Sequence, residues 1–158
     1  MKIADSTARL IIICGLPGSG KTTLAQHLEK KRSAVRLSPD DWMTALSINL
    51  YDGESRAKIE ALQWQLGQKF LQLGGVVIIE WGTWSKSERD ALREGAQALG
   101  AAVELHYLSA PPEVLFERIQ HRAMEDPPIR YEDLLQWVKT FEVPTPAELR
   151  SYDPPVSA

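Results

Sequence analysis

The residues with the clearest chemistry lie in the segment "GLPGSGKTT", which spans positions 15–23. Residues 15–22 meet the pattern G-x-x-x-x-G-K-[ST], in which backbone amides curl around an anion and the following helix adds its positive end. In such a loop the lysine supplies a mobile charge for the β- and γ-phosphates, and the threonine hydroxyl is the expected Mg²⁺ ligand. The sequence therefore predicts a site for a nucleoside triphosphate and Mg²⁺. The residues expected to bind the nucleotide are Gly15, Pro17, Gly18, Ser19, Gly20, Lys21, Thr22 and Thr23.

The elements around this loop are expected to alternate between strand and helix. The apolar run "RLIIIC" at 9–14 predicts a strand buried on both faces, and residues 20–31 predict the helix that the loop opens. Further strands are expected at 34–37, 76–80 and 102–108, and further helices at 41–48, 54–73, 85–99, 112–122 and 131–141. This alternation is typical of a parallel sheet covered by helices on both faces. We predict one α/β domain, 1–158, with three layers (α/β/α) and a mainly parallel sheet of four or five strands. The last part of this domain, 145–158, is expected to be a loosely held tail.

The composition excludes several classes of protein. The formal charge is -3 over 158 residues, so the chain has no general electrostatic attraction for nucleic acid or an anionic membrane, and neither is the expected partner. Cys14 is the one cysteine, so an internal disulfide or a cysteine metal cluster is excluded. No apolar run approaches the ~20 residues that span a bilayer, and residues 1–8 are too short and polar for a signal peptide. The chain is expected to be cytoplasmic.

Other proteins that use this loop carry segments that the sequence lacks. A GTPase is expected to contain N-K-x-D, which does not occur in the chain. A motor or transporter ATPase is expected to carry four apolar residues followed by Asp, whereas the nearest segment is "VVIIE", which ends at Glu80. A small phosphotransferase fits these absences best.

The segment "GLPGSGKTTLA" followed by "SPDDW" resembles the kinase branch of P-loop proteins that includes zeta toxins, chloramphenicol phosphotransferases and polynucleotide 5'-hydroxyl kinases. The resemblance implies a P-loop NTPase fold and a catalytic aspartate at the end of the second strand, at Asp40. A carboxylate there orients the attacking hydroxyl and accepts its proton. An alternative is that Asp40 or Asp41 caps the next helix.

The family also carries basic residues on a lid helix after the fourth strand. The segment "LFERIQHRAMEDPP" resembles that helix and places Arg118 and Arg122 four residues apart, where an arginine fork neutralises charge on the transferring phosphoryl group. The alternative is a solvated helix face. Several members have an arginine shortly after the catalytic aspartate, but Met43 stands there in this chain, which argues against a phosphorylated or polynucleotide acceptor.

Glu80 and three tryptophans are expected at the carboxyl edge of the sheet, where ligands of open α/β sheets bind. Glu80 is expected to order a Mg²⁺-bound water or to contact the acceptor, against the alternative of a structural contact with the loop. Trp42, Trp81 and Trp84 are candidates for the flat apolar walls of an acceptor pocket, although any one of them also fits a core position. Trp137 lies on the apolar face of a helix and is expected to serve packing.

The combined prediction is an ATP-dependent kinase that phosphorylates a hydroxyl of a small molecule, such as a sugar, nucleoside, antibiotic or nucleotide-sugar. The predicted catalytic residues are Asp40, Lys21, Arg118 and Arg122. One alternative is a polynucleotide 5'-hydroxyl kinase. Another, of a different class, is a switch module whose ATP hydrolysis acts on a partner protein.

Overall fold

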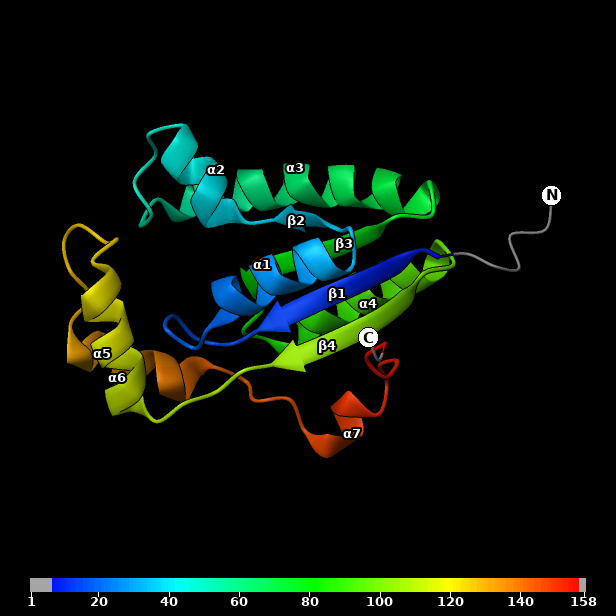
Figure 1. Cartoon of the computed structure of the whole chain (residues 1–158). Coiled ribbons are helices and arrows are strands. Elements are labelled where there is room, and N and C mark those ends of the chain that lie inside the picture. The colour runs from blue at the N-terminus through cyan, green and yellow to red at the C-terminus, as the bar shows by residue number, and fades with distance from the viewer. Residues whose placement is uncertain (1–6, 157–158) are drawn as a thin grey trace.

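A computed structural model describes residues 7–156 of the chain (Figure 1). Most of the segment 1–8 and both ends of the predicted domain 1–158 lie outside these residues. In chain order the elements are β1 (Arg9–Cys14), α1 (Lys21–Lys31), β2 (Val35–Leu37), α2 (Pro39–Ala45), α3 (Gly53–Gln72), β3 (Val76–Gly82), α4 (Lys86–Ala98), β4 (Ala102–Tyr107), α5 (Pro112–Arg122), α6 (Tyr131–Thr140) and α7 (Pro146–Leu149). Between residues 7 and 156, no helix is long and apolar enough to cross a membrane.

The sheet is parallel, and its strand order is β2-β3-β1-β4. β1 lies in the centre, with Leu10 opposite Val77 of β3 and Val103 of β4. Every residue of β1 from Leu10 to Cys14 is fully buried, as expected for a strand covered on both faces. The predicted α/β class with a four- or five-stranded parallel sheet is confirmed, with four strands in residues 7–156.

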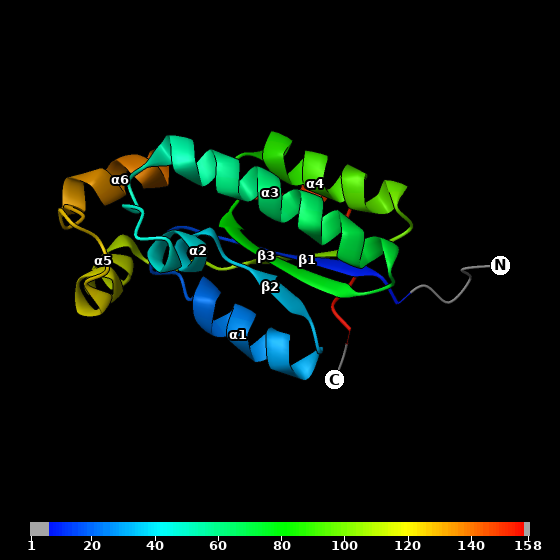
Figure 2. The same cartoon turned by 90° about the horizontal axis from the view of Figure 1, so that it is seen from above.

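Helices cover both faces of the sheet, so the predicted three layers are also present. Figure 2 shows α3 and α4 on one face and α1 on the other. Alternate residues of β1 point to opposite sides: Leu10 and Ile12 pack with Leu71 of α3 and Leu92 of α4, whereas the other side packs on α1. The carboxyl end of β1 runs into the loop that opens α1 (Figure 1), and the carboxyl end of β3 lies beside it, with Gly82 opposite Cys14.

The edge of β4 that is not paired with β1 is covered by the C-terminal segment. The backbone amide of Asp153 donates to the carbonyl of Val103 at 2.8 Å, and the Asp153 carboxylate accepts from the amide of Val103 at 2.8 Å. These contacts satisfy edge groups that a fifth strand would otherwise pair. A fifth strand is absent from the part of the chain that the structure describes.

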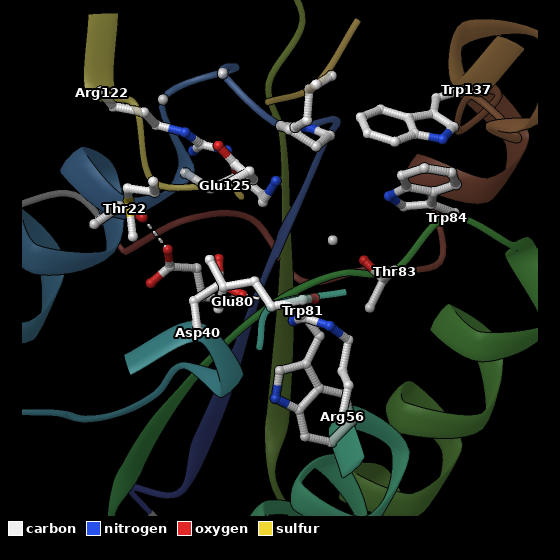
Figure 3. Close-up of a pocket in the computed structure, with 18 of the residues that line it drawn as sticks. Thr22, Asp40, Arg56, Glu80, Trp81, Thr83, Trp84, Arg122, Glu125 and Trp137 are labelled. Carbon is white, nitrogen blue, oxygen red and sulfur yellow. Dashed lines mark hydrogen bonds and ion pairs between the residues drawn. The ribbon is translucent and has the colours of Figure 1, made fainter. Parts of the chain in front are cut away.

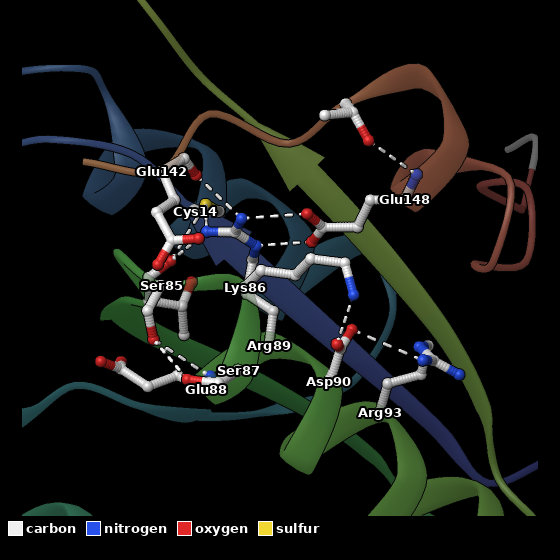
Figure 4. Close-up of polar contacts among 12 residues, drawn as sticks. Cys14, Ser85, Lys86, Ser87, Glu88, Arg89, Asp90, Arg93, Glu142 and Glu148 are labelled. Atoms are coloured by element: carbon white, nitrogen blue, oxygen red, sulfur yellow. Dashed lines mark hydrogen bonds and ion pairs between the residues drawn. The ribbon is translucent and has the colours of Figure 1, made fainter.

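A buried ion pair holds the same segment against the strand ends (Figure 4). The Arg89 guanidinium of α4 donates to both carboxylate oxygens of Glu148 in α7, at 2.6 and 3.0 Å, and to the carbonyls of Thr83 and Glu142, at 2.7 and 2.8 Å. Both side chains are almost completely buried. This arrangement differs from the expectation of a loosely held tail at 145–158, because the tail supplies the only carboxylate that neutralises Arg89 among the described residues.

Replacing Glu148 with Ala is expected to lower the free energy of unfolding by about 3–5 kcal/mol, because it leaves the Arg89 charge buried without a partner. Urea denaturation followed by tryptophan fluorescence measures this loss. Glu142→Ala is the matched control, since Glu142 contacts Arg89 only through its carbonyl. A loss no larger than that of the control would contradict the role assigned to the pair.

Candidate functional site

A pocket of about 770 Å³ lies at the carboxyl ends of the strands (Figure 3). It is lined by the loop before α1, the first turn of α2, one face of α3, the end of β3, the first turn of α4, and helices α5 and α6. The lining residues are Pro17, Gly18, Gly20, Lys21, Thr22, Thr23, Asp40, Leu50, Tyr51, Arg56, Glu60, Glu80, Trp81, Gly82, Thr83, Trp84, Glu88, Arg118, Arg122, Met124, Glu125, Ile129 and Trp137. This is the carboxyl edge where the sequence predicts a site.

The glycine-rich loop has the backbone geometry that the motif requires. Gly18 has a φ of +83°, and a Cβ there would lie 2.6 Å from the carbonyl oxygen of Leu115 in α5, so only glycine fits. Gly20, with a φ of +99°, is the N-cap of α1 and offers no side chain to the first-turn amides. Those amides are therefore free of a side-chain cap and available to an anion.

Two of the residues predicted to bind nucleotide do not line this pocket. Gly15 lies under the loop, where a Cβ would come within 2.7 Å of the carbonyl oxygen of Leu108. Ser19 is buried and lines a separate cavity of about 100 Å³ between the loop and Phe141. Gly15 and Ser19 therefore lie on the side of the loop that faces away from the pocket, and the other residues predicted to bind the nucleotide lie on the pocket side.

The Lys21 ammonium folds back on its own loop. Its Nζ donates to the carbonyl oxygens of Gly15, at 2.8 Å, and Leu16, at 3.1 Å. Burial lowers the pKa of Lys21 to about 8, and the nearby Glu80 and Asp40 carboxylates oppose this shift. Lys21 is therefore poised to exchange carbonyl partners for a stronger anionic one.

Glu80, at the end of β3, joins the loop to β2. It accepts a hydrogen bond from the Thr22 hydroxyl and, at 2.8 Å, one from Arg36 Nη1 (Figure 3). Arg36 also pairs with Asp41, which turns the Asp41 carboxylate away from the pocket. Arg36 was not identified from the sequence, because a single arginine in a short strand belongs to no motif from which its contacts with Glu80 and Asp41 could be predicted.

Asp40 reaches the pocket from the first turn of α2. Its Oδ1 accepts from Arg56 Nη2 at 2.7 Å, and 43 % of its side chain is exposed. Ser38 is the N-cap of α2, with its Oγ accepting from the Asp41 amide at 3.3 Å, so the alternative that an aspartate caps this helix is wrong. Arg56, on α3, is another residue that the sequence did not single out.

Arg118 and Arg122 of α5 both line the pocket on the loop side. Arg118 Nη1 donates to the carbonyl oxygen of Gly18 at 3.1 Å, and Arg122 Nη2 pairs with Glu125 at 2.6 Å. One guanidinium therefore touches the loop itself. Both arginines of the predicted helix therefore line the same pocket as Lys21 and Thr22.

The tryptophans divide between pocket and core. Trp81 and Trp84 line the pocket as predicted, and Trp81 Nε1 donates to Gln63 Oε1 at 2.9 Å. Trp42 does not line it and packs on the core of the α3/α4 face. Trp137, expected only to pack, faces the pocket with its ring centroid 5.9 Å from that of Trp84 (Figure 3). Three indoles of the described chain therefore line the pocket, and those of Trp84 and Trp137 pack against each other.

The parallel sheet, the glycine-rich loop before α1 and the strand-end pocket define a P-loop fold. The chain belongs to the AAA domain family AAA_33, whose model matches residues 10–144. The resemblance to P-loop kinases is confirmed by this match. A gluconokinase of Arabidopsis thaliana is 28% identical over 135 residues, which cover 77% of this chain and 71% of that protein.

Solved structures show the same fold. Chaetomium thermophilum Kti12 in complex with ADP-AlF3 matches with a TM-score of 0.67 at 23% identity, covering 87% of this chain and 82% of that one. A chain of the Pnkp1/Rnl/Hen1 RNA repair complex matches with a TM-score of 0.71 at 20% identity, covering 92% of this chain and 46% of that one.

Proposed function

We propose that the protein is an ATP-dependent phosphotransferase that moves the γ-phosphoryl group to a hydroxyl of a small molecule. One observation carries the proposal: the Asp40 carboxylate and the Lys21 loop line the same pocket from opposite elements, α2 and the start of α1. A hydroxyl between them would attack the γ-phosphorus as the bond to the bridging oxygen of ADP breaks. Its proton would pass to Asp40.

The cationic wall suits the charge of a transferring phosphoryl group. Lys21 would leave its loop carbonyls for the phosphates, while Arg118 and Arg122 would approach from α5. In a pocket closed from water, such fixed charges are worth more than in solution. The chain's own contribution to rate is therefore positioning and charge neutralisation.

The pair of Thr22 and Glu80 fits Mg²⁺. A hydroxyl and a carboxylate already in contact are the oxygen ligands this ion takes, and Mg²⁺ is usually held by one or two carboxylates together with substrate phosphates. Thr22 would bind the ion directly and Glu80 through a water. The ion would neutralise charge on the β- and γ-phosphates.

A polynucleotide 5'-hydroxyl kinase is the second candidate, favoured by the fold match to a chain of an RNA repair complex. The pocket supports it less well. Carboxylates Glu60, Glu88 and Glu125 line it and would repel a phosphate backbone. Met43 is fully buried and offers no contact to such a substrate.

Transfer of label from γ-labelled ATP tests the proposal, with pooled sugars, nucleosides, amino alcohols, aminoglycosides and short oligonucleotides as acceptors. The expected result is a labelled small molecule. Label found on oligonucleotides alone would favour the second candidate. Release of free phosphate at a rate that no acceptor pool changes would favour the switch module and contradict the proposal.

The affinity for ATP is expected to fall about tenfold between pH 7 and pH 9, because Lys21 loses its proton near pH 8 in the free protein. Bound phosphates favour the charged form, so binding above pH 8 requires proton uptake. Calorimetry in two buffers of different ionisation enthalpy measures both effects. Lys21→Arg should remove most of the pH dependence, and a wild-type affinity that stays constant from pH 7 to pH 9 would contradict the assignment.

A further inference from the structure

The charges in the pocket are unevenly divided. On the loop side, Lys21, Arg118 and Arg122 supply positive charge. On the side of α3 and α4, Arg56 is the lining residue with positive charge, and it is already committed to Asp40 at 2.7 Å and to the Leu50 carbonyl oxygen at 3.2 Å. We call the side formed by α3 and α4 the acceptor side. Among the described residues that line it, no positively charged side chain is free of hydrogen-bond partners.

Glu60 is the unusual group on this side. Its carboxylate is half-buried, lines the pocket from α3, and has no hydrogen-bond or ion-pair partner in residues 7–156. Burial raises its pKa to about 7; the Arg56 guanidinium opposes this shift, while Glu88 of α4 and Asp40 of α2 reinforce it. Glu88 also lines the pocket without an ion-pair partner among these residues. Two carboxylates thus face one cavity, and neither forms an ion pair with another residue of the described chain.

Thr83 gives an independent sign that this part of the pocket binds a ligand. It lines the pocket and is only 1 % exposed, yet its Oγ1 is buried without a hydrogen-bond partner in the described chain. Its φ is +46°, a strained backbone conformation for a β-branched residue. In Figure 3 its side chain lies between Trp81 and Trp84. A buried hydroxyl held in this way is normally paired, so a bound molecule is the natural partner.

The indole pair adds an attraction for cations. Trp84 and Trp137 lie at 57° to one another, so they present differently oriented ring faces at the pocket. The face of an indole attracts an ammonium group as well as flat apolar surface. Aromatic rings and unpaired carboxylates in one cavity match a ligand that combines an amine with an apolar body.

We propose that the phosphoryl acceptor carries a protonated amine in addition to its hydroxyl, with the amine held by Glu60 and Glu88, the apolar part against Trp84 and Trp137, and a hydrogen bond to Thr83. This inference rests on the proposed function and names the class of its acceptor: amino alcohols and amino sugars with an apolar face. Acceptors with a carboxylate or a phosphate are disfavoured, because they would meet unpaired carboxylates.

Three aromatic alcohols that differ in charge test this preference: phenylalaninol (cationic), 3-phenylpropanol (neutral) and 3-phenyllactate (anionic). Binding to the wild-type protein with ADP and Mg²⁺ is measured by calorimetry at pH 8. The expected order is cation, neutral, anion, with at least about tenfold between the first two. Equal or tighter binding of the neutral or anionic compound, or no binding of all three, would overturn the proposal.

Variants locate the preference within the pocket. Glu60→Gln is expected to remove most of the advantage of phenylalaninol while ADP affinity, which reports a folded nucleotide site, stays within a few-fold. Glu54→Gln is the matched control, since Glu54 is an exposed residue of the same helix that does not line the pocket. A Glu60→Gln protein that binds ADP and keeps the full preference would overturn the role of Glu60. If that variant fails to bind ADP, Glu88→Gln decides, with a reduced preference expected and an unchanged one contradictory.

The pH dependence gives a readout that a structural role would not produce. Because Glu60 ionises near pH 7, affinity for phenylalaninol should rise about tenfold from pH 6 to pH 8 in the wild type and stay flat in Glu60→Gln. An unchanged wild-type affinity would count against the proposal. These binding results do not depend on catalysis, so a chain that selects the cation yet transfers no label would refute the proposed function and leave the ligand class standing.

Discussion

Asp40→Asn is expected to slow phosphoryl transfer by ~10²–10⁴-fold while the affinity for ATP and Mg²⁺ changes by no more than a few-fold. An amide keeps the size of the side chain and can still contact Arg56, but it cannot accept the proton of the attacking hydroxyl. Asp40 contacts Arg56 and not the loop, so the nucleotide site should remain intact. Single-turnover transfer to the identified acceptor, compared with nucleotide titration, separates the two effects.

Asp41→Asn is the matched control for this experiment. Asp41 is the next residue in the chain, but it pairs with Arg36 and does not line the pocket. Its replacement should slow transfer by less than about threefold. The assignment of Asp40 would be wrong if the control lost more activity than Asp40→Asn did, or if Asp40→Asn transferred at the wild-type rate.

Lys21→Ala is expected to weaken nucleotide binding by ~10–100-fold, because hydrogen bonds to charged groups contribute about 1.5–3 kcal/mol each. The transfer rate at saturating ATP should fall further, since the lost charge also stabilises the γ-phosphoryl group as it moves. Titration with a fluorescent ATP analogue and single-turnover kinetics measure these effects.

Lys30→Ala serves as the control for Lys21→Ala. Lys30 is an exposed lysine in the last turn of α1, at the opposite end of the helix from the loop. Its removal changes the net charge equally but leaves the loop untouched. Equal losses in the two variants would show a general effect of charge, and a Lys21→Ala protein with wild-type affinity would remove Lys21 from the site.

The fold could be predicted for the elements whose sequence pattern lies within the element itself. Runs such as "RLIIIC" are buried on both faces and identify central strands, and the loop lies between a strand and a helix as its motif requires. The boundaries of α2 were less accurate. We expected a helix at 41–48, whereas it spans Pro39–Ala45, because Ser38 caps it and proline is favoured in a first helical turn.

The C-terminal segment illustrates what local patterns miss. Its attachment depends on Arg89 and Glu148, which are 59 residues apart in the chain, and on two backbone contacts of Asp153 with β4. Neither the residue types nor their spacing predicts that Arg89 and Glu148 form an ion pair. A segment rich in proline and polar residues therefore resembled a loose tail in the sequence, although it is fixed in the structure.

The candidate site also contains residues that local patterns predict and residues that only the folded structure identifies. Asp40 was predicted from the resemblance to P-loop kinases, Glu80 from its place at a strand end, and Lys21 from its motif, and all three line the pocket. Arg56 and Glu60 could not be recognised, because the sequence does not tell which face of α3 turns toward the pocket. Trp42 was misplaced for a similar reason: α2 turns its indole to the core, while Trp137 of α6 takes a place in the pocket.

A crystal structure with Mg²⁺ and a non-hydrolysable ATP analogue tests the central claim most directly. The account predicts the triphosphate within the amides of residues 15–22, Lys21 Nζ moved from its loop carbonyls to the phosphates, and the Asp40 carboxylate facing the γ-phosphate across the space for an acceptor. A nucleotide bound elsewhere, a loop without phosphate, or Asp40 turned away from the γ-phosphate would contradict it.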